Sequence, residues 1–261
     1  MIHDVTQPLL RVQNLHCAYG VRAVVRDISL DLWPGEVLAI VGESGSGKTT
    51  LLNAMAARHA PTSGTVAFAM LDAGLQDIYA LSEAQRRLLA RTDWGFVHQH
   101  AADGLRMNVS AGANVAERLM ALGHRHYGNL RAQASDWLTR VEIDPSRIDD
   151  RPDTFSGGMR QRLQIARNLI TQPRLVFMDE PTSGLDVSVQ ARLLDMLRML
   201  TRQMNLAAVI VTHDLAVARL LAQRMLVMQG GVAVETGLTD QVLDDPQHPY
   251  TQLLVSSVLP P

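Results

Sequence analysis

Short apolar runs separated by turn-forming residues dominate the first part of the chain. Runs of this length, rich in β-branched and aliphatic side chains and bounded by Gly or Pro, are typical of strands. The pattern predicts strands over residues 9–15, 28–33, 36–41 and 64–69, with the Pro34-Gly35 turn ahead of the third. Between the last two strands, residues 47–58 have the apolar spacing of a helix. Ser82, followed three residues later by Gln85, resembles a capping box that opens another helix.

The hydrophobic spacing changes to a helical period from about residue 100 to residue 170. Helices are predicted there over residues 113–123, 131–141 and 158–170. Strand and helix patterns then alternate again, with strands over 174–179 and 206–213, helices over 187–204 and 215–223, and a closing strand pair over 224–229 and 231–236. Alternation of this kind predicts one α/β domain, and the helical stretch predicts an insertion within it.

Composition and charge exclude several classes of protein. With 47% hydrophobic and 19% charged residues, the chain is typical of a globular protein with a sizeable core. Its net charge of −2 argues against a nucleic-acid-binding surface. Cys17 is the only cysteine, so no internal disulfide can form and a reducing cytoplasm is expected. The N-terminal sequence lacks a secretory signal pattern, and every apolar run is far shorter than the roughly 20 residues that span a bilayer. Any membrane contact should therefore be made through another protein.

A glycine-rich loop between a predicted strand and a predicted helix carries the clearest chemical signal. Residues 42–49 read GESGSGKT, which matches the phosphate-loop pattern in its required strand–loop–helix context. In such a loop the backbone N–H groups surround the β-phosphate, the lysine reaches the β- and γ-phosphates, and the last hydroxyl binds Mg²⁺. The nucleotide-binding residues expected are Gly42, Glu43, Ser44, Gly45, Ser46, Gly47, Lys48, Thr49 and Thr50.

A pair of carboxylates ends the predicted strand over residues 174–179, where the chain reads LVFMDE. Asp179 can hold the hydration shell of Mg²⁺, and Glu180 can orient or deprotonate an attacking water. Taken alone, a strand that ends in an ordinary polar turn is the simpler interpretation. Beside a phosphate loop, the catalytic interpretation is favoured.

With further motifs in the same order, the chain resembles the ATP-binding cassette (ABC) ATPases over essentially its whole length. Tyr19 is similar to the aromatic residue that stacks on adenine, and Gln99 to the glutamine of the loop that joins the core to the helical subdomain. Residues 155–159, FSGGM, resemble the family signature, and residues 183–186, SGLD, the loop after the carboxylates. His213 is similar to the switch histidine that contacts the γ-phosphate.

The resemblance implies the fold and the activity. It implies an α/β fold, an ABC-type P-loop NTPase with a RecA-like core, an N-terminal antiparallel β portion and an inserted helical subdomain. A single domain would span residues 1–261, with the core over about 1–99 and 172–261 and the helical subdomain over about 100–171. The implied activity is Mg²⁺-dependent hydrolysis of ATP. Its residues would be Glu180, His213 and Gln99 for catalysis, and Thr49, Gln99 and Asp179 at the Mg²⁺ ion.

The signature also implies a dimer. In this family the signature of one protomer contacts the γ-phosphate that the phosphate loop of the other protomer holds, and the simplest partner is a second copy of the same chain. Ser156, Gly157 and Gly158 would make this contact, and Asp186 would lie in the loop between protomers. Two positions differ from the family, which usually has Leu and Gln where this chain has Phe155 and Met159. The ATP contact should persist, whereas the lost glutamine amide bears on the turnover rate.

Two subfamilies compete for the partner. The tail over residues 244–258, DDPQHPYTQLLVSSV, resembles that of ATPase subunits from oligopeptide-type importers, which usually continue well beyond the point where this chain ends. Residues 94–128, 147–159 and 248–259 instead resemble the ABC subunit of the bacterial carbon–phosphorus lyase system. We therefore expect a cytoplasmic ATPase dimer that associates with the soluble carbon–phosphorus lyase core complex, without nucleic acid and without direct membrane insertion. The alternative is an importer motor bound to a membrane permease.

Two further interpretations carry less weight. A nucleotide-gated adaptor that barely hydrolyses ATP is opposed by the intact Glu180 and His213. The histidine pairs His98/His100 and His124/His126 are interpreted as solvated side chains rather than as a metal site.

Overall fold

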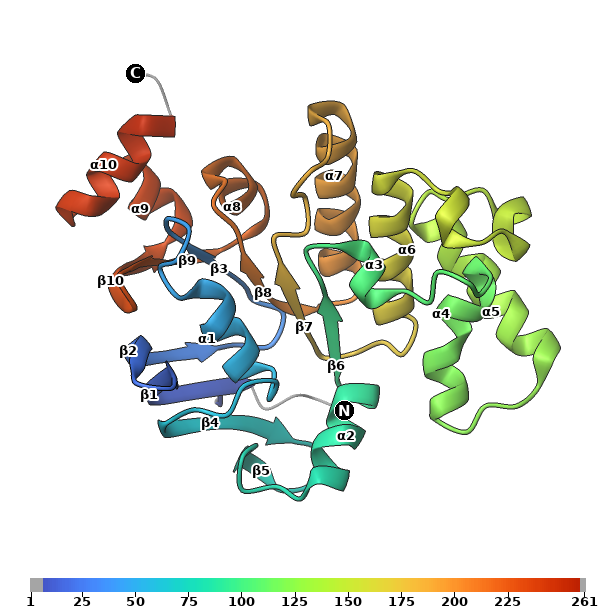
Figure 1. Ribbon diagram of the computed structural model, residues 1–261, viewed down its shortest axis with the longest axis horizontal. Coiled ribbons are helices and arrows are strands. Elements are labelled where there is room, and N and C mark those ends of the chain that lie inside the picture. The colour runs from blue at the N-terminus through green and yellow to red at the C-terminus, as the bar shows by residue number, and fades with distance from the viewer. Residues whose placement is uncertain (1–6, 259–261) are drawn as a thin grey trace. The chain divides into compact units, whose positions relative to one another are not determined.

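The computed structural model describes residues 7–258 (Figure 1). The chain divides into two compact units. The first unit is formed by Met1–Arg86 together with Asn205–Pro261, and the second by Arg87–Met204. These two units do not correspond to the core and the helical subdomain predicted from the sequence, so the boundaries of those two parts stay a prediction. The start of the chain, on which the expected lack of a secretory signal rests, lies partly outside the described residues.

A four-stranded antiparallel sheet in the first unit is built from the amphipathic strands near the N-terminus. Leu10, Val12, Leu15 and Cys17 are buried, and more exposed positions lie between them. Because neighbouring side chains of a strand point to opposite faces, Leu10 and Val12 share one face, and so do Leu15 and Cys17. A register shift between Val12 and Leu15 changes the phase of the alternation between the two pairs. Its strand order is β2-β1-β4-β5, with β1 (Leu10–Tyr19), β2 (Arg22–Leu32), β4 (Ser63–Met70) and β5 (Gly74–Asp77).

A set of more hydrophobic strands in the same unit carries the phosphate loop. β3 (Val37–Val41) pairs in parallel with β8 (Ala207–Val211) and with β9 (Arg224–Gln229), and β9 pairs antiparallel with β10 (Val232–Leu238). Every residue of β3 and β8 is buried, which is typical of parallel strands covered on both faces. The helices of this unit are α1 (Lys48–Met55), α8 (Leu215–Leu221), α9 (Thr239–Asp244) and α10 (Pro249–Val258).

The second unit combines two parallel strands with most of the helices. β6 (Trp94–Val97) pairs with β7 (Leu175–Asp179), and α4 packs against α5 and α6. The helices are α3 (Ala101–Gly104), α4 (Ala111–Ala121), α5 (Tyr127–Arg140), α6 (Gly157–Leu169) and α7 (Val187–Gln203), with short 3-10 turns at Pro145–Asp149 and Pro152–Thr154. α2 (Glu83–Thr92) crosses the boundary between the two units. Over residues 7–258, no helix has the length and apolar character needed to cross a membrane.

Most of the elements predicted from the sequence are confirmed, including the helical stretch up to residue 170. The capping box is confirmed in both directions, because Ser82 Oγ accepts from the backbone N–H of Gln85 at 3.3 Å and the Gln85 side chain accepts from the backbone N–H of Ser82 at 2.9 Å. The strands β5 and β6 and the helices α3, α9 and α10 were not predicted. β5 and β6 have only four residues each, too few to show an alternating pattern.

Candidate active site

The phosphate loop connects β3 to α1, and its backbone conformation requires glycine. Gly42, Gly45 and Gly47 have φ angles of 147°, 81° and 102°, a region that other residues rarely adopt. A Cβ atom on Gly42 would lie 2.2 Å from the backbone oxygen of Met228, and one on Gly47 would lie 2.6 Å from that of Val24. Two glycines of the motif are therefore fixed both by backbone handedness and by close packing.

Lys48 and Ser46 give this loop its chemistry. The Lys48 side chain is only 6% exposed, and its Nζ donates to the backbone oxygens of Gly42 at 2.8 Å and Glu43 at 2.7 Å. The Ser46 hydroxyl is buried and has no hydrogen-bond partner within the part of the chain that the structure describes. An unpaired buried hydroxyl is costly, and a phosphate oxygen would satisfy it. The loop therefore fits a nucleotide phosphate group.

A tyrosine from the C-terminal part of the chain braces the start of the phosphate loop. The hydroxyl of Tyr250, a residue only 6% exposed, accepts from the backbone N–H of Glu43 at 3.0 Å. The segment before Tyr250 is held in turn by Glu235 of β10, whose carboxylate accepts from the backbone N–H groups of Gln247 at 2.8 Å and His248 at 3.0 Å. Burial alone raises the pKa of Glu235, but these hydrogen bonds outweigh it and lower the pKa. No pattern in the sequence predicts the contact between Tyr250 and Glu43.

Tyr19 and His213 are the other two predicted site residues of the first unit. Tyr19 ends β1 and is 55% exposed, with its ring centre 4.6 Å from that of His59. An aromatic ring exposed to this extent is available to stack on a planar ligand. His213 follows β8 and is also exposed.

In the second unit, the structure brings Gln99 and Glu180 together. Gln99 Nε2 donates to Glu180 Oε2 at 3.3 Å and to Ser183 Oγ at 3.2 Å. Gln99 lies two residues beyond β6 and Glu180 directly beyond β7, so the parallel pairing of these strands places both at the same sheet edge. Asp179 is the last residue of β7. Glu180 has a φ of 43°, a left-handed conformation that costs about 1–3 kcal/mol and is typical of functional sites.

The signature residues form the start of α6. Ser156 is the N-cap, and its Oγ accepts from the backbone N–H of Met159 at 3.3 Å. Ser156 and Gly157 are exposed, whereas Gly158 is buried and a Cβ atom there would lie 2.4 Å from Cγ1 of Val189. A 13-residue helix whose N-cap and first residue are exposed and carry no bulky side chain offers N–H groups and a positive dipole end to an anion.

The two departures from the usual signature pack against one arginine. The guanidinium of Arg147 lies 4.3 Å from the ring centre of Phe155, and its Nη1 lies 3.5 Å from Sδ of Met159. Arg147 Nε also pairs with Asp150 at 2.7 Å. Phe155 and Met159 are therefore part of the packing that supports the start of α6.

Asp186 is the N-cap residue of α7, and its side chain makes no capping hydrogen bond. It is exposed, and the next residue, Val187, is 84% exposed. Among the described residues, no group of three or more His, Cys, Asp or Glu side chains is placed to hold a metal ion.

A phosphate loop, a carboxylate pair after a buried strand and a signature helix together define a nucleotide hydrolase of the cassette class, and the chain belongs to the ABC transporter family. The model of that family matches residues 25–183, and the model of the C-terminal region of oligopeptide and dipeptide transporters matches residues 234–261. The chain is an ATP-binding ABC ATPase that hydrolyses ATP. The predicted α/β fold, a P-loop NTPase with a RecA-like core, an antiparallel β portion and an inserted helical subdomain, is confirmed.

Individual proteins and solved structures similar to this chain give more detail than the family models. The chain is 66% identical, over 97% of its length and 98% of the relative, to PhnK of Escherichia coli, which is named as an ATP-binding protein of phosphonates utilization. It is 34% identical, over 97% of its length and 77% of the relative, to the dipeptide transport ATP-binding protein DppD of Bacillus subtilis. Among solved structures, the dimeric ATP-binding cassette MJ0796 in a post-hydrolysis state with ADP and Pi matches with a TM-score of 0.78 and 27% identity. That match covers 88% of this chain and 98% of the other.

Proposed function

We propose that two copies of this chain bind Mg²⁺ and ATP between them and couple hydrolysis to the soluble carbon–phosphorus lyase core complex of phosphonate breakdown, in the cytoplasm. The observation that carries this proposal is the 66% identity, over 97% of the chain, to a protein named for phosphonates utilization. The aligned region covers 97% of the chain, so it extends across most or all of the loop after Gln99, where a change of partner is expected to appear first.

The residues take the following roles in this proposal. Lys48 and the backbone N–H groups of residues 42–49 bind the phosphates, Tyr19 stacks on adenine, and His213 contacts the γ-phosphate. Glu180 accepts a proton from the attacking water. Its hydrogen bond from Gln99 at 3.3 Å fixes the direction in which the carboxylate points.

The donor atoms proposed for Mg²⁺ are all oxygens, as this small hard cation prefers. They are the Thr49 hydroxyl, the Asp179 carboxylate and the Gln99 amide oxygen. The Gln99 amide nitrogen is engaged with Glu180 and Ser183, so the amide oxygen is the atom assigned to the metal. When bound, Mg²⁺ neutralises charge that develops on the β- and γ-phosphate oxygens.

A dimer explains why the signature residues at the start of α6 are exposed. The chain already has one phosphate loop, and the first turn of α6 offers a second group of anion-binding N–H donors. The exposed Asp186 and Val187 at the start of α7 offer further surface for a second chain. The dimeric cassettes among the solved structures support this arrangement.

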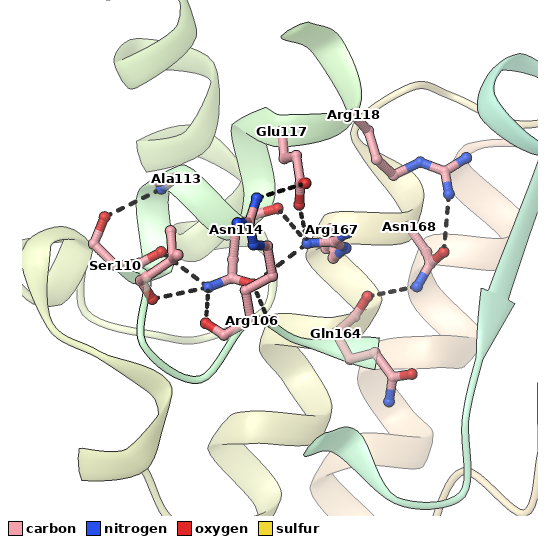
Figure 2. A network of polar contacts seen from close by, with 10 residues as sticks. Arg106, Ser110, Ala113, Asn114, Glu117, Arg118, Gln164, Arg167 and Asn168 are labelled. Carbon is pink, nitrogen blue, oxygen red and sulfur yellow. Dashed lines mark hydrogen bonds and ion pairs between the residues drawn. The ribbon is translucent and has the colours of Figure 1, made fainter. Parts of the chain in front are cut away.

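The segment over residues 101–114 is the proposed contact with the lyase complex. Asp103, Arg106 and Asn108 are exposed, whereas Leu105 is only 7% exposed and belongs to the core. The Arg106 side chain, 61% exposed, pairs with Glu117 at 3.1 Å. Glu117 also pairs with Arg167 at 2.6 Å, so it keeps a partner when Arg106 is replaced (Figure 2).

Reversing one charge tests this contact. Arg106→Glu should weaken retention of the soluble lyase core on the tagged protein while leaving the basal ATPase rate unchanged, because an exposed ion pair contributes only about 0–1 kcal/mol to stability. Arg131→Glu is the matched control, since the Arg131 side chain is 39% exposed and also pairs with a carboxylate, that of Asp149 at 2.7 Å. Equal loss of retention in both variants would contradict the assignment of this segment.

The second candidate function is the motor of an importer. It is favoured by the match of residues 234–261 to the C-terminal region of oligopeptide and dipeptide transporters. The same pull-down decides between the two functions. If the wild-type protein does not bind the soluble lyase core and co-purifies with a membrane permease, the proposal is contradicted and the importer function is supported.

A further inference from the structure

One edge of β6 is completed by side chains rather than by another strand. β6 pairs with β7, and no second strand pairs with it within residues 7–258. A strand edge of this kind presents backbone N–H and C=O groups that need partners when they are buried. On this edge and just beyond it lie the N–H of Phe96 and both backbone polar groups of His98.

Three amide side chains of α6 supply the partners. Asn168 Oδ1 accepts from the N–H of Phe96 at 3.0 Å, and Gln164 Oε1 accepts from the N–H of His98 at 2.6 Å. The His98 carbonyl accepts from Gln164 Nε2 at 3.1 Å and from Gln161 Nε2 at 3.3 Å. Positions 161, 164 and 168 lie on one face of a helix. That face therefore acts as a neighbouring strand would.

Gln164 is the centre of this contact. It is 0% exposed, and its single amide holds the N–H and the C=O of the same residue. A Cβ atom on Gly104 would lie 2.3 Å from Gln164 Oε1, so α3 also packs closely against this amide. Burying an amide without hydrogen-bond partners costs free energy. The hydrogen bonds to His98 offset that cost and explain why a glutamine is buried at this position.

Neighbouring residues hold the rest of the edge. Figure 2 shows Arg118 of α4 reaching Asn168, with Gln164 one helical turn away. Arg118 Nη2 also donates to the backbone oxygen of Trp94 at 2.6 Å. Burial, with a contribution from Arg167, lowers the pKa of Arg118 to about 10, so the guanidinium is still charged at neutral pH. β6 is thus fixed along its length by side chains of α4 and α6.

We infer that Gln164 is a positioning residue for ATP hydrolysis and that it acts through Gln99. His98 directly precedes Gln99, so fixing its two backbone groups fixes the point from which the Gln99 side chain reaches Glu180 Oε2 at 3.3 Å. Because α6 begins at the signature, the same amide ties the signature helix to the Gln99–Glu180 pair. The inference rests on the roles proposed above for Gln99 and Glu180.

The first test separates turnover from binding. Gln164→Leu keeps the approximate volume and removes both hydrogen bonds to His98, so kcat should fall about 10-fold while KM for ATP changes less than about 2-fold. Gln164→Glu keeps the acceptor for the N–H of His98 and should lose less. Thr201→Val is the control, because it removes a different buried hydrogen bond of the same unit, to Leu197 at 2.9 Å. It should lower the melting temperature without lowering kcat.

A double-mutant cycle identifies the route of the effect. If Gln164 acts through Gln99, then Gln164→Leu should cause no further loss of kcat in a Gln99→Ala background. A second full 10-fold loss there would overturn the inference. Normal turnover of Gln99→Ala alone would instead contradict the role proposed for Gln99. If Gln99→Ala lowers kcat but Gln164→Leu keeps the wild-type kcat, only the positioning role of Gln164 is contradicted.

Hydrogen exchange gives a readout that does not depend on catalysis. In Gln164→Leu, the backbone amide of His98 should exchange faster, while that of Phe96, which Asn168 still holds, and those of β7 keep the wild-type rate. Faster exchange throughout the second unit would show a general loss of packing and would contradict a specific role. If Gln164→Leu does not fold, the same measurement on Gln164→Glu applies, with protection of the His98 N–H expected to persist.

Discussion

Tyr250→Phe removes a single hydroxyl and tests whether the C-terminal segment prepares the phosphate loop. That hydroxyl accepts from the backbone N–H of Glu43 at 3.0 Å, and the rest of the side chain stays in place because it is buried. A hydrogen bond of this kind contributes a net of about 0.5–1.5 kcal/mol. If all of this free energy holds the loop in its binding conformation, its loss weakens ATP binding by about 2- to 10-fold.

The effect should appear in binding and not in the chemical step. KM for ATP should rise by that factor while kcat stays within about 2-fold, because Glu180 and Gln99 are not altered. Thermal unfolding provides an independent measure, since a ligand raises the stability of the folded state by an amount set by its concentration relative to Kd. The increase in melting temperature produced by a fixed ATP concentration should be smaller in Tyr250→Phe than in the wild type.

Tyr79→Phe is the matched control for this experiment. The hydroxyl of Tyr79 lies 2.7 Å from the backbone oxygen of Ala54 and 2.6 Å from that of His59, so its single hydrogen is shared between two carbonyls, neither of which belongs to residues 42–49 of the phosphate loop. This variant should lose melting temperature and keep its affinity for ATP. If Tyr250→Phe behaves in the same way, the tyrosine only fastens the C-terminal segment, and the reasoning about loop preparation is wrong.

Further predictions follow from the remaining site residues. Glu180→Gln should slow hydrolysis by roughly 10²-fold or more while ATP binding persists, as measured by phosphate release and nucleotide titration. Lys48→Ala should weaken ATP binding by the single chain, whereas Ser156→Arg should spare it and block ATP-dependent dimers in gel filtration. Because its folded-state pKa is lowered, Glu235 stabilises the fold at a pH above the ordinary glutamate pKa of about 4.3, and this stabilisation is lost as the pH falls below that value and through the lowered pKa of the folded state. Melting curves of Glu235→Gln should depend less on pH over this range.

The phosphate loop and the signature could be predicted from the sequence because their chemistry is local. Each is a short run in which the spacing of glycines and hydroxyls, joined by a lysine in the phosphate loop, reflects backbone conformation and anion binding at that point. Gly42 and Gly47 show this directly, since any side chain at either position would collide with the backbone. Strand and helix patterns were predictable for the same reason, because each depends on residues only a few positions apart.

The contacts that support the site could not be predicted, because they join distant parts of the chain. Tyr250 and Glu43 are separated by 207 positions, and Gln164 and His98 by 66. The pattern inside α6 does not indicate which of its polar residues are buried. Gln164 and Asn168 are polar residues of an amphipathic helix, a pattern that favours a solvated face, yet they are 0% and 5% exposed. Only the open edge of β6 explains their burial.

The late position of α6 in the chain has a consequence for synthesis. β6 ends at Val97, while its strand partner β7 begins at Leu175 and the amide that holds His98 comes 66 residues after it. At a translation rate of about 5–20 residues per second, the ribosome takes about 3–13 s to add those residues. During this interval neither edge of the nascent strand WGFV has its native partner, and open edges of this kind promote pairing between chains. A chaperone that shields residues 94–98 until α6 has emerged would therefore raise the yield of folded protein.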